Sequence, residues 1–230
     1  MAETMVDTGT NRATVEAHGI QHVQCPTDAL AALGFDAAQV HTVIVTHLHF
    51  DDIGNLDRFP NAHFIAPEAE MRFATGPDMQ APFIRRPYGA SETSRVIDYL
   101  YQDCVTLHGE TMQVASGLSV HLVGGHTAGQ SIVRVPTRRG WVVLASDALH
   151  YYAELERAIP FAVVHDMSRM LAAHRTIRAL ANSDAHIVPA HDPLVMQRYP
   201  AALPGLLGVV ARLDLLPNHW RCPGHCQAAR

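Results

Sequence analysis

Residues 42–52 read Thr42-Val43-Ile44-Val45-Thr46-His47-Leu48-His49-Phe50-Asp51-Asp52, and they join an apolar run to four potential metal ligands. The β-branched residues predict a strand over 42–46. His47 and His49 alternate with Leu48, so in an extended segment both imidazoles face the same side. Imidazoles and carboxylates at the end of a strand are typical of a divalent-metal site, and we prefer that interpretation to a solvated polar turn.

Three further strand-like runs end on the same kinds of side chain. Residues 118–123 lead through two glycines to His126, residues 141–146 lead to Asp147, and residues 186–190 lead to His191. Short β-rich segments bounded by Gly, Pro and Asp predict strands, so four loop tips can bring these ligands together. The resulting set is large enough for two ions. It comprises His47, His49, Asp51, Asp52, His126, Asp147 and His191.

The chain contains 16 histidines, so histidines will also occur near one another by chance. Ordinary surface or core positions explain the isolated ones better than a metal site does. These are His18, His22, His41, His63, His108, His121, His165 and His174.

The order of the seven ligands resembles the metallo-β-lactamase superfamily, whose signature is His-x-His-x-Asp-His followed by a distant His, an Asp and a last His. Val6-Asp7-Thr8-Gly9 resembles the first motif of that family, and Ala190-His191-Asp192-Pro193 resembles the last, so the resemblance covers most of the chain. Within the superfamily, residues 124–131 and 146–151 are most similar to the quorum-quenching N-acyl homoserine lactonases.

The resemblance implies a fold, a cofactor and a reaction. The fold is an α/β sandwich of two mixed sheets flanked by helices. His47, His49 and His126 would hold a first divalent ion, and Asp51, Asp52 and His191 a second, with Asp147 as a bridge. We expect zinc in both positions and count Asp51 and Asp147 among the catalytic residues. Water activated between two ions would open a lactone ring, which removes the need for a serine or cysteine nucleophile.

Two groups near the ligands have open roles. In the lactonases that the chain resembles, a tyrosine shortly after the bridging aspartate assists the substrate; here His150 and Tyr151 occupy that region. Either residue fits a polar catalytic helper or packing at the sheet edge. An apolar set fits either a pocket for an acyl chain or core and lid contacts. It consists of Met71, Phe73, Met79, Phe83 and Ile84.

The sequence departs from the family pattern in two places. Asp52 stands where the family has its third clustered histidine, which replaces a neutral nitrogen by an anionic oxygen. That exchange favours oxygen-preferring ions such as manganese or iron in the second position. The chain also begins almost at the first motif, without the strands that usually precede it, and the sequence leaves open whether this start is natural.

Composition narrows the class of protein. With 230 residues, 48% hydrophobic and 17% charged, we expect a single domain over 1–230 whose last part, 213–230, is a flexible tail. In that tail, Cys222 and Cys226 with His219 fit either free thiols or a small metal site. The net charge of −5 argues against a nucleic-acid partner, and the lack of a long apolar run argues against a membrane segment. A cytoplasmic protein is expected, and a homodimer is compatible with the sequence.

Pattern and turn residues predict the remaining elements. Helices are expected at 28–33, 36–40, 53–59, 67–75, 91–102 and 166–181, strands at 61–65 and between 105 and 146, and an irregular lid at 76–89. The expected function is metal-dependent hydrolysis of a small lactone, with N-acyl homoserine lactone as the leading substrate. One alternative is a metallohydrolase for another ester, aryl lactone or thioester. Another is a metal-binding or sensor protein that Asp52 has impaired as an enzyme.

Overall fold

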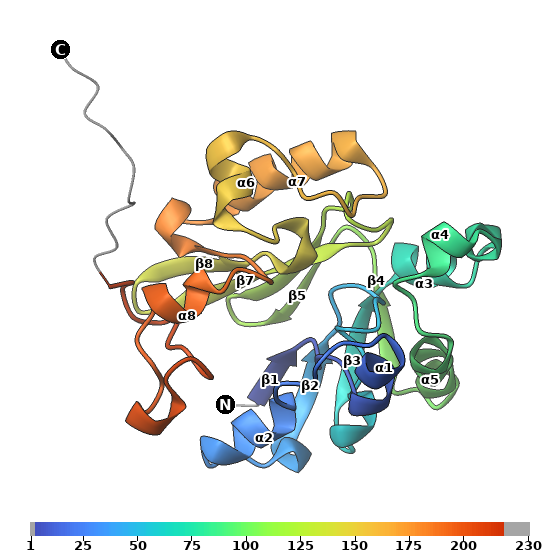
Figure 1. Cartoon of the computed structure of the whole chain (residues 1–230), viewed down its shortest axis with the longest axis horizontal. Helices are drawn as coiled ribbons and strands as arrows, with labels where there is room; N and C mark the ends of the chain where they lie inside the picture. The colour runs from blue at the N-terminus through green and yellow to red at the C-terminus, as the bar shows by residue number, and fades with distance from the viewer. Residues whose placement is uncertain (1–2, 219–230) are drawn as a thin grey trace.

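Two β-sheets, each covered by helices on one side, form the computed structural model, which describes residues 3–218 (Figure 1). The first sheet is parallel, in the order β1 (Glu3–Val6), β2 (Val40–Ile44), β3 (His63–Pro67) and β4 (Val105–His108). The second contains β5 (Thr111–Ala115), β6 (Leu118–Leu122), β7 (Ser131–Thr137), β8 (Gly140–Leu144) and β9 (Ile187–Val188). Its strands are antiparallel except for the parallel pair of β8 and β9.

The helices follow their strands along the chain. The α-helices are α1 (Arg12–Ala17), α2 (Pro26–Ala32), α3 (Glu68–Ala74), α4 (Pro82–Arg85), α5 (Ala90–Tyr101), α6 (Tyr152–Arg157), α7 (Met167–Leu180) and α8 (Leu194–Arg198). Short 3₁₀ turns lie at 37–39, 56–58, 77–80, 146–148, 184–186 and 204–206. In Figure 1, α6 and α7 lie against the second sheet, whereas α1, α2 and α5 surround the first.

Alternation along the strands produces this layering, because neighbouring residues of a strand point to opposite faces. The interface between the sheets is formed by Ile44, Ile65, Val120 and Val133. Val43 and Phe64 point the other way and pack with Val96 of α5. Ile132 likewise points outward and packs with Ile177 of α7. Each central strand therefore has one apolar face toward the other sheet and one toward a helix.

The structure confirms the expected arrangement of two sheets flanked by helices, with one correction. The first sheet is parallel throughout, so only the second is mixed. The helices expected at 67–75, 91–102 and 166–181 correspond to α3, α5 and α7. The segment expected as an irregular lid contains a 3₁₀ turn at 77–80 and the short α4.

The helix expected at 53–59 is reduced to a 3₁₀ turn, Leu56–Arg58. The backbone before it is already engaged with the first motif: Thr8 N–H donates to Asp52 O at 2.6 Å, and Gly54 N–H donates to Gly9 O at 2.8 Å. A Cβ on Gly54 would lie 2.4 Å from the backbone nitrogen of Asn11. The pairing with residues 8–11 thus takes the place of the first helical turn.

The expected tail at 213–230 lies mostly outside the described residues, as do Cys222, Cys226 and His219. At its start, Leu213 is partly buried, and its carbonyl accepts a hydrogen bond of 2.6 Å from Arg139 Nε. Within residues 3–218, no helix combines the length and apolar character needed to cross a bilayer.

Candidate metal centre

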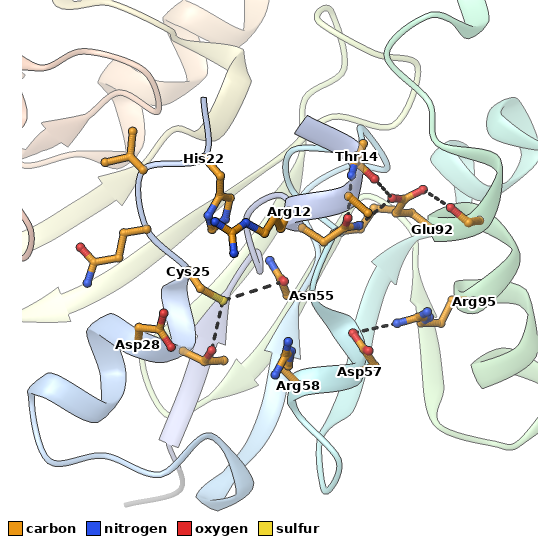
Figure 2. A pocket seen from close by; sticks show the side chains of 18 residues that line it. Arg12, Thr14, His22, Cys25, Asp28, Asn55, Asp57, Arg58, Glu92 and Arg95 are labelled. Carbon is orange, nitrogen blue, oxygen red and sulfur yellow. Dashed lines mark hydrogen bonds and ion pairs between the residues drawn. The ribbon is translucent and has the colours of Figure 1, made fainter. Parts of the chain in front are cut away.

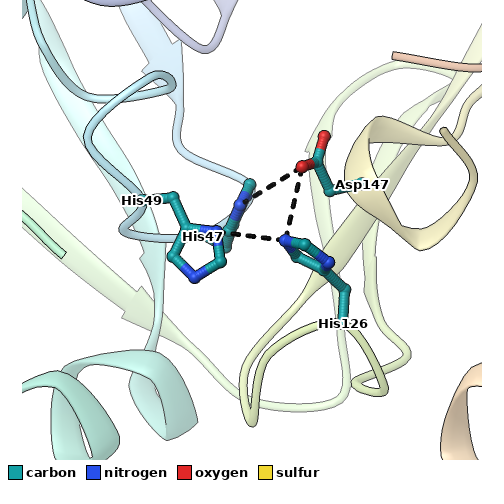
Figure 3. A group of neighbouring side chains, drawn as sticks. All are labelled: His47, His49, His126 and Asp147. Carbon is teal, nitrogen blue, oxygen red and sulfur yellow. Dashed lines mark hydrogen bonds and ion pairs between the residues drawn. The ribbon is translucent and has the colours of Figure 1, made fainter. Parts of the chain in front are cut away.

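The ligand-bearing segments that follow β2, β6 and β8 meet at one place (Figure 3). His126 Nε2 lies 3.0 Å from His49 Nδ1 and 3.3 Å from Asp147 Oδ2. His47 Nε2 lies 3.9 Å from the same Asp147 oxygen. One donor atom from each of these four buried side chains lies within 4.8 Å of the others. The four therefore form a first group suited to one ion, which we call the His47 group.

A second group shares Asp147 and brings in the loop after β9. His191 Nε2 lies 3.1 Å from Asp147 Oδ1, and His150 Nε2 lies 3.2 Å from Asp147 Oδ2. Donor atoms of Asp147, His150 and His191 again lie within 4.8 Å of one another, and we call this set the His191 group. Asp147 belongs to both groups, as expected of a bridge between two ions.

The two clustered aspartates lie beside these groups. Asp52 Oδ2 is 3.3 Å from His47 Nε2, and its side chain is 13% exposed. Asp51 is half-buried and close enough to Asp147 for the two carboxylates to repel each other. Among the described residues, neither aspartate contributes a donor atom to the two groups.

The segment that carries His47 and His49 is fixed at both of its faces. Leu48 is fully buried in the core of the first sheet, which turns the flanking imidazoles toward the centre. On the other side, Thr46 donates its N–H to Asp7 Oδ1 at 2.8 Å and its hydroxyl to Asp7 Oδ2 at 2.7 Å. The Thr46 hydroxyl is also 2.7 Å from Ser146 Oγ, next to Asp147.

Two strained backbone conformations lie beside Thr46. Asp7 has φ of 53° and Ser146 has φ of 45°, a left-handed conformation that non-glycine residues rarely adopt. Both residues contact Thr46, so the first motif, the His47 segment and the Asp147 turn are bound to each other. Such strain persists where surrounding contacts determine the conformation, and it is typical of functional sites.

The loop that carries His126 depends on a close approach to α7. Gly125 has φ of 101°, and a Cβ there would lie 2.5 Å from Met170 Cα, so a side chain would displace the helix. His126 Nδ1 donates to the carbonyl of Val163 at 2.9 Å. That bond leaves the Nε2 lone pair free to face the centre, as in histidines that bind metals.

Glu70 of α3 links the two loops of the His47 group. It is fully buried; Oε1 accepts from Leu48 N–H at 3.3 Å and from the Tyr88 hydroxyl at 2.8 Å. Oε2 accepts from Gly129 N–H at 2.8 Å. Burial raises the pKa of Glu70 against the effect of these donors. Glu70 was not predicted from the sequence, although it lies four residues before Ala74 on the apolar face of the helix, and that spacing predicts burial.

Glu154 has the corresponding role in the His191 group. Its Oε1 accepts from the N–H groups of His150 at 2.8 Å and Tyr151 at 2.7 Å. Its Oε2 accepts from Phe161 N–H at 2.8 Å. His191 N–H donates to the carbonyl of His150 at 3.2 Å. Glu154 was not predicted from the sequence either, although an acidic residue in the first turn of a helix is a signal for such a role.

The electrostatics keep the imidazoles of the His47 group neutral. Burial lowers the pKa of His47 to about 3 and that of His126 to about 4, and it also lowers the pKa of His49. Burial opposes ionisation of Asp147, but hydrogen bonds from His150 and His191 outweigh it, and the pKa of Asp147 lies well below its usual value. At neutral pH the group therefore offers unprotonated nitrogens around a carboxylate.

The pKa values of the other carboxyls near the centre are raised. Burial raises the pKa of Asp7 to about 7, even though Thr46 donates two hydrogen bonds to it. Burial and then repulsion by Asp7 raise the pKa of Asp52 well above its usual value. Burial and repulsion by Asp147 raise the pKa of Asp51. This excess of buried carboxyls is relieved by a positive charge placed among them.

The residues present fit divalent metal ions. His47 Nε2 is fully buried without a hydrogen-bond partner among the described residues, and Asp52 Oδ2 beside it also lacks one. Unpartnered buried polar atoms are rare in proteins and here converge on one point. A donor set of neutral imidazoles and a carboxylate is the set that zinc prefers.

An apolar cavity of ≈ 630 Å³ opens beside the His47 group. His49 and His126 form its floor, and Tyr88 contacts the ring of His49 edge-on at 4.7 Å. Its apolar walls include Ile20, Phe50, Phe73, Phe83, Ile84 and Val163. Of the apolar set whose role the sequence left open between a pocket and core or lid contacts, Phe73, Phe83 and Ile84 line this cavity, whereas Met71 is buried in the core of the first sheet.

A second cavity, of ≈ 690 Å³, lies around α1 and α5, and none of the residues of the His47 and His191 groups lines it (Figure 2). Several of its charged side chains have local partners: Arg12 pairs with Glu16, and Arg95 pairs with Asp57 at 2.7 Å. Glu92 accepts from Thr14 and Asn11.

Comparison with known proteins gives three kinds of match. Residues 2–191 match the sequence model of the metallo-beta-lactamase superfamily. N-acyl homoserine lactonase AttM from Rhizobium johnstonii is 29% identical over 182 residues, 76% of this chain and 66% of that protein. AttM from Agrobacterium fabrum is 27% identical over 171 residues, 72% of this chain and 63% of that protein. The aligned part of the chain thus spans about two thirds of these relatives.

Solved structures share the fold. An N-acyl homoserine lactone hydrolase, with the product N-hexanoyl-L-homoserine bound at its catalytic metal center, has a TM-score of 0.67. The match covers 82% of this chain and 76% of that one, at 21% identity. Hydrolase AbOPH of the beta lactamase superfamily has a TM-score of 0.66 at 20% identity, covering 83% of this chain and 68% of that one.

Proposed function

Since the chain belongs to the metallo-β-lactamase superfamily, we propose that it is a metal-dependent hydrolase that opens a lactone ring, with N-acyl homoserine lactone as substrate. The observation that carries the proposal is the pair of ligand groups that share Asp147 beside an apolar cavity. A lactone at the floor of that cavity lies against His49 and His126, and an acyl arm lies against the apolar walls. The curated relatives named as lactonases support the same substrate class.

Metal ions supply the central chemistry when bound: they polarise the substrate carbonyl and activate water as the nucleophile. The protein's own residues prepare that chemistry. Neutral His47, His49 and His126 present lone pairs, and the ionised Asp147 holds both groups in one unit. Tyr88 and the apolar walls exclude bulk water from one side of the floor.

Tyr151 is the residue that we assign to the substrate's polar end. It follows His150 directly, and the residue is 37% exposed, so part of it is open to a bound molecule. Its N–H is held by Glu154 at 2.7 Å, which fixes the backbone beneath the ring. A hydroxyl at this place can donate to a carbonyl or to a departing alkoxide.

The test is hydrolysis by zinc-loaded protein of a panel of N-acyl homoserine lactones, aryl lactones and aryl esters. We expect ring opening of the acylated lactones, with loss of activity after chelation and recovery when zinc is added. Turnover of aryl esters without lactones would instead indicate the broader metallohydrolase. Binding of zinc without any turnover would indicate the metal-binding or sensor protein.

A further inference from the structure

We propose that His150 is a metal ligand and that it completes the second metal position with Asp147 and His191, in place of Asp52. The inference rests on the metal-dependent function proposed above and identifies the ligands of its second ion. His150 Nε2 is 3.2 Å from Asp147 Oδ2, and His191 Nε2 is 3.1 Å from Asp147 Oδ1. Ligand atoms that bind one zinc ion at roughly 2.0–2.2 Å lie within about 4.4 Å of one another, a separation that this group approaches without large movement.

Asp52 is less well placed for the same role. Its Oδ2 lies 3.3 Å from His47 Nε2, on the side of the other group, and the His191 group contains no atom of it. A carboxylate on this backbone position is also shorter than the imidazole that the family pattern has there. The second position therefore lacks a nitrogen from the clustered motif, and His150 provides one from the loop after β8.

The surroundings of His150 favour metal binding over contact with substrate. The residue is only 4% exposed. Its ring stacks on His191 at 5.2 Å between centroids and packs under Phe161 at 4.2 Å. Neither His150 nor Tyr151 lines the apolar cavity, but Tyr151 is 37% exposed and so is open to a bound molecule, whereas His150 is covered. A covered ring with one nitrogen 3.2 Å from a carboxylate is suited to an ion held between them.

The loops of the group hold His150 in that position. Glu154 accepts the N–H groups of His150 and Phe161, so one carboxylate fixes both the ligand and the ring above it. His191 N–H donates to His150 O at 3.2 Å, and Ala190 N–H donates to Leu149 O at 3.0 Å. The two ligand-bearing loops therefore form a short backbone pair. These contacts fix the backbone from which the His150 ring projects toward Asp147.

The experiment compares zinc content after saturation and removal of free zinc, measured by mass spectrometry of the metal. The variants are His150→Phe, which keeps an aromatic ring without nitrogen, Asp52→Ala and His191→Ala. The matched control is His174→Phe, which changes another buried histidine near Glu154 that belongs to neither group. We expect two ions per chain in the wild type, Asp52→Ala and His174→Phe, and one in His150→Phe and His191→Ala.

Two ions in His150→Phe, one ion in Asp52→Ala, or one ion in the wild type would each overturn the inference. Should His150→Phe fail to fold, anomalous diffraction from zinc-loaded wild type decides: a zinc peak at roughly 2.0–2.1 Å from His150 Nε2 supports it, and a peak at Asp52 with none at His150 overturns it. A wild type that binds no zinc contradicts the proposed function as well. Two ions held by His150 and His191 without lactone hydrolysis would sink the lactonase proposal alone.

Discussion

Replacing Glu70 by Gln tests whether the buried carboxylate couples the two loops of the His47 group. The carboxylate accepts three hydrogen bonds, from Leu48 N–H, the Tyr88 hydroxyl and Gly129 N–H. A glutamine of the same shape offers only one oxygen. Its best arrangement directs that oxygen to Gly129 and the NH₂ group to Tyr88, whose hydroxyl can accept. Leu48 N–H then loses its acceptor inside the core.

The expected loss in the free energy of unfolding follows from the single unpaired donor, the N–H of Leu48. A buried N–H without a partner costs about 1–3 kcal/mol. Weaker neutral hydrogen bonds at the other two donors are offset by the removal of a buried charge, whose burial already raises the pKa of Glu70. We therefore expect Glu70→Gln to lower the free energy of unfolding by about 1–3 kcal/mol, which corresponds to roughly 2–12 °C in Tm for a chain of this size. Zinc affinity should fall by about 10–100-fold, as for other residues that orient metal ligands.

The assay combines thermal unfolding of metal-free protein with zinc titration against a coloured chelator. Glu68→Gln is the control, because Glu68 lies on the same helix with a 47% exposed side chain and, among residues 3–218, pairs only with Arg72 one turn away. Loss of such a surface pair changes stability by less than about 0.5 kcal/mol. If Glu70→Gln behaves like Glu68→Gln in both measurements, the proposed coupling of the two loops is wrong.

The metal-type residues were accessible from sequence because each lies within a few residues of the end of a strand. An apolar run such as Val43-Ile44-Val45 predicts a strand, and the histidines and aspartates that follow it indicate metal binding. The sandwich follows from the same alternation, since Ile44 and Val43 must face different layers. Both inferences use information that lies within a few residues of the chain.

The choice among ligands for the second ion was not accessible in this way. Whether Asp52 or His150 reaches Asp147 depends on side-chain length and on how the loops after β8 and β9 pair, which involves contacts about 40 residues apart. The parallel first sheet and the short turn at 56–58 likewise depend on pairing with residues 3–11. Local sequence patterns do not reveal these contacts between residues that lie far apart in the chain.

Three further predictions address the centre and its cavity. His49→Ala should abolish hydrolysis and remove one zinc ion while changing Tm little, because the side chain lies on a loop. Activity, metal content and thermal unfolding are measured on one preparation of the variant. Normal turnover would contradict the prediction. Phe73→Ala should raise KM for long-chain substrates by about 10-fold or more, with a smaller effect on short-chain ones, since the lost contact is apolar; an equal effect on both would place the acyl arm elsewhere. We expect acid to release the ion bound through His191 before the ion bound by the His47 group. Burial lowers the pKa of His47 to about 3 and of His126 to about 4, so protons compete with zinc there only near those values, whereas the hydrogen bond to Asp147 raises the pKa of His191 and lets protons compete at higher pH. As pH falls, the ion bound through His191 should therefore leave first, and the single ion of His191→Ala should persist at the pH where the wild type has lost one. Zinc content after equilibrium dialysis across that pH range measures both proteins, and loss from His191→Ala over the interval of the first wild-type release would refute the assigned order.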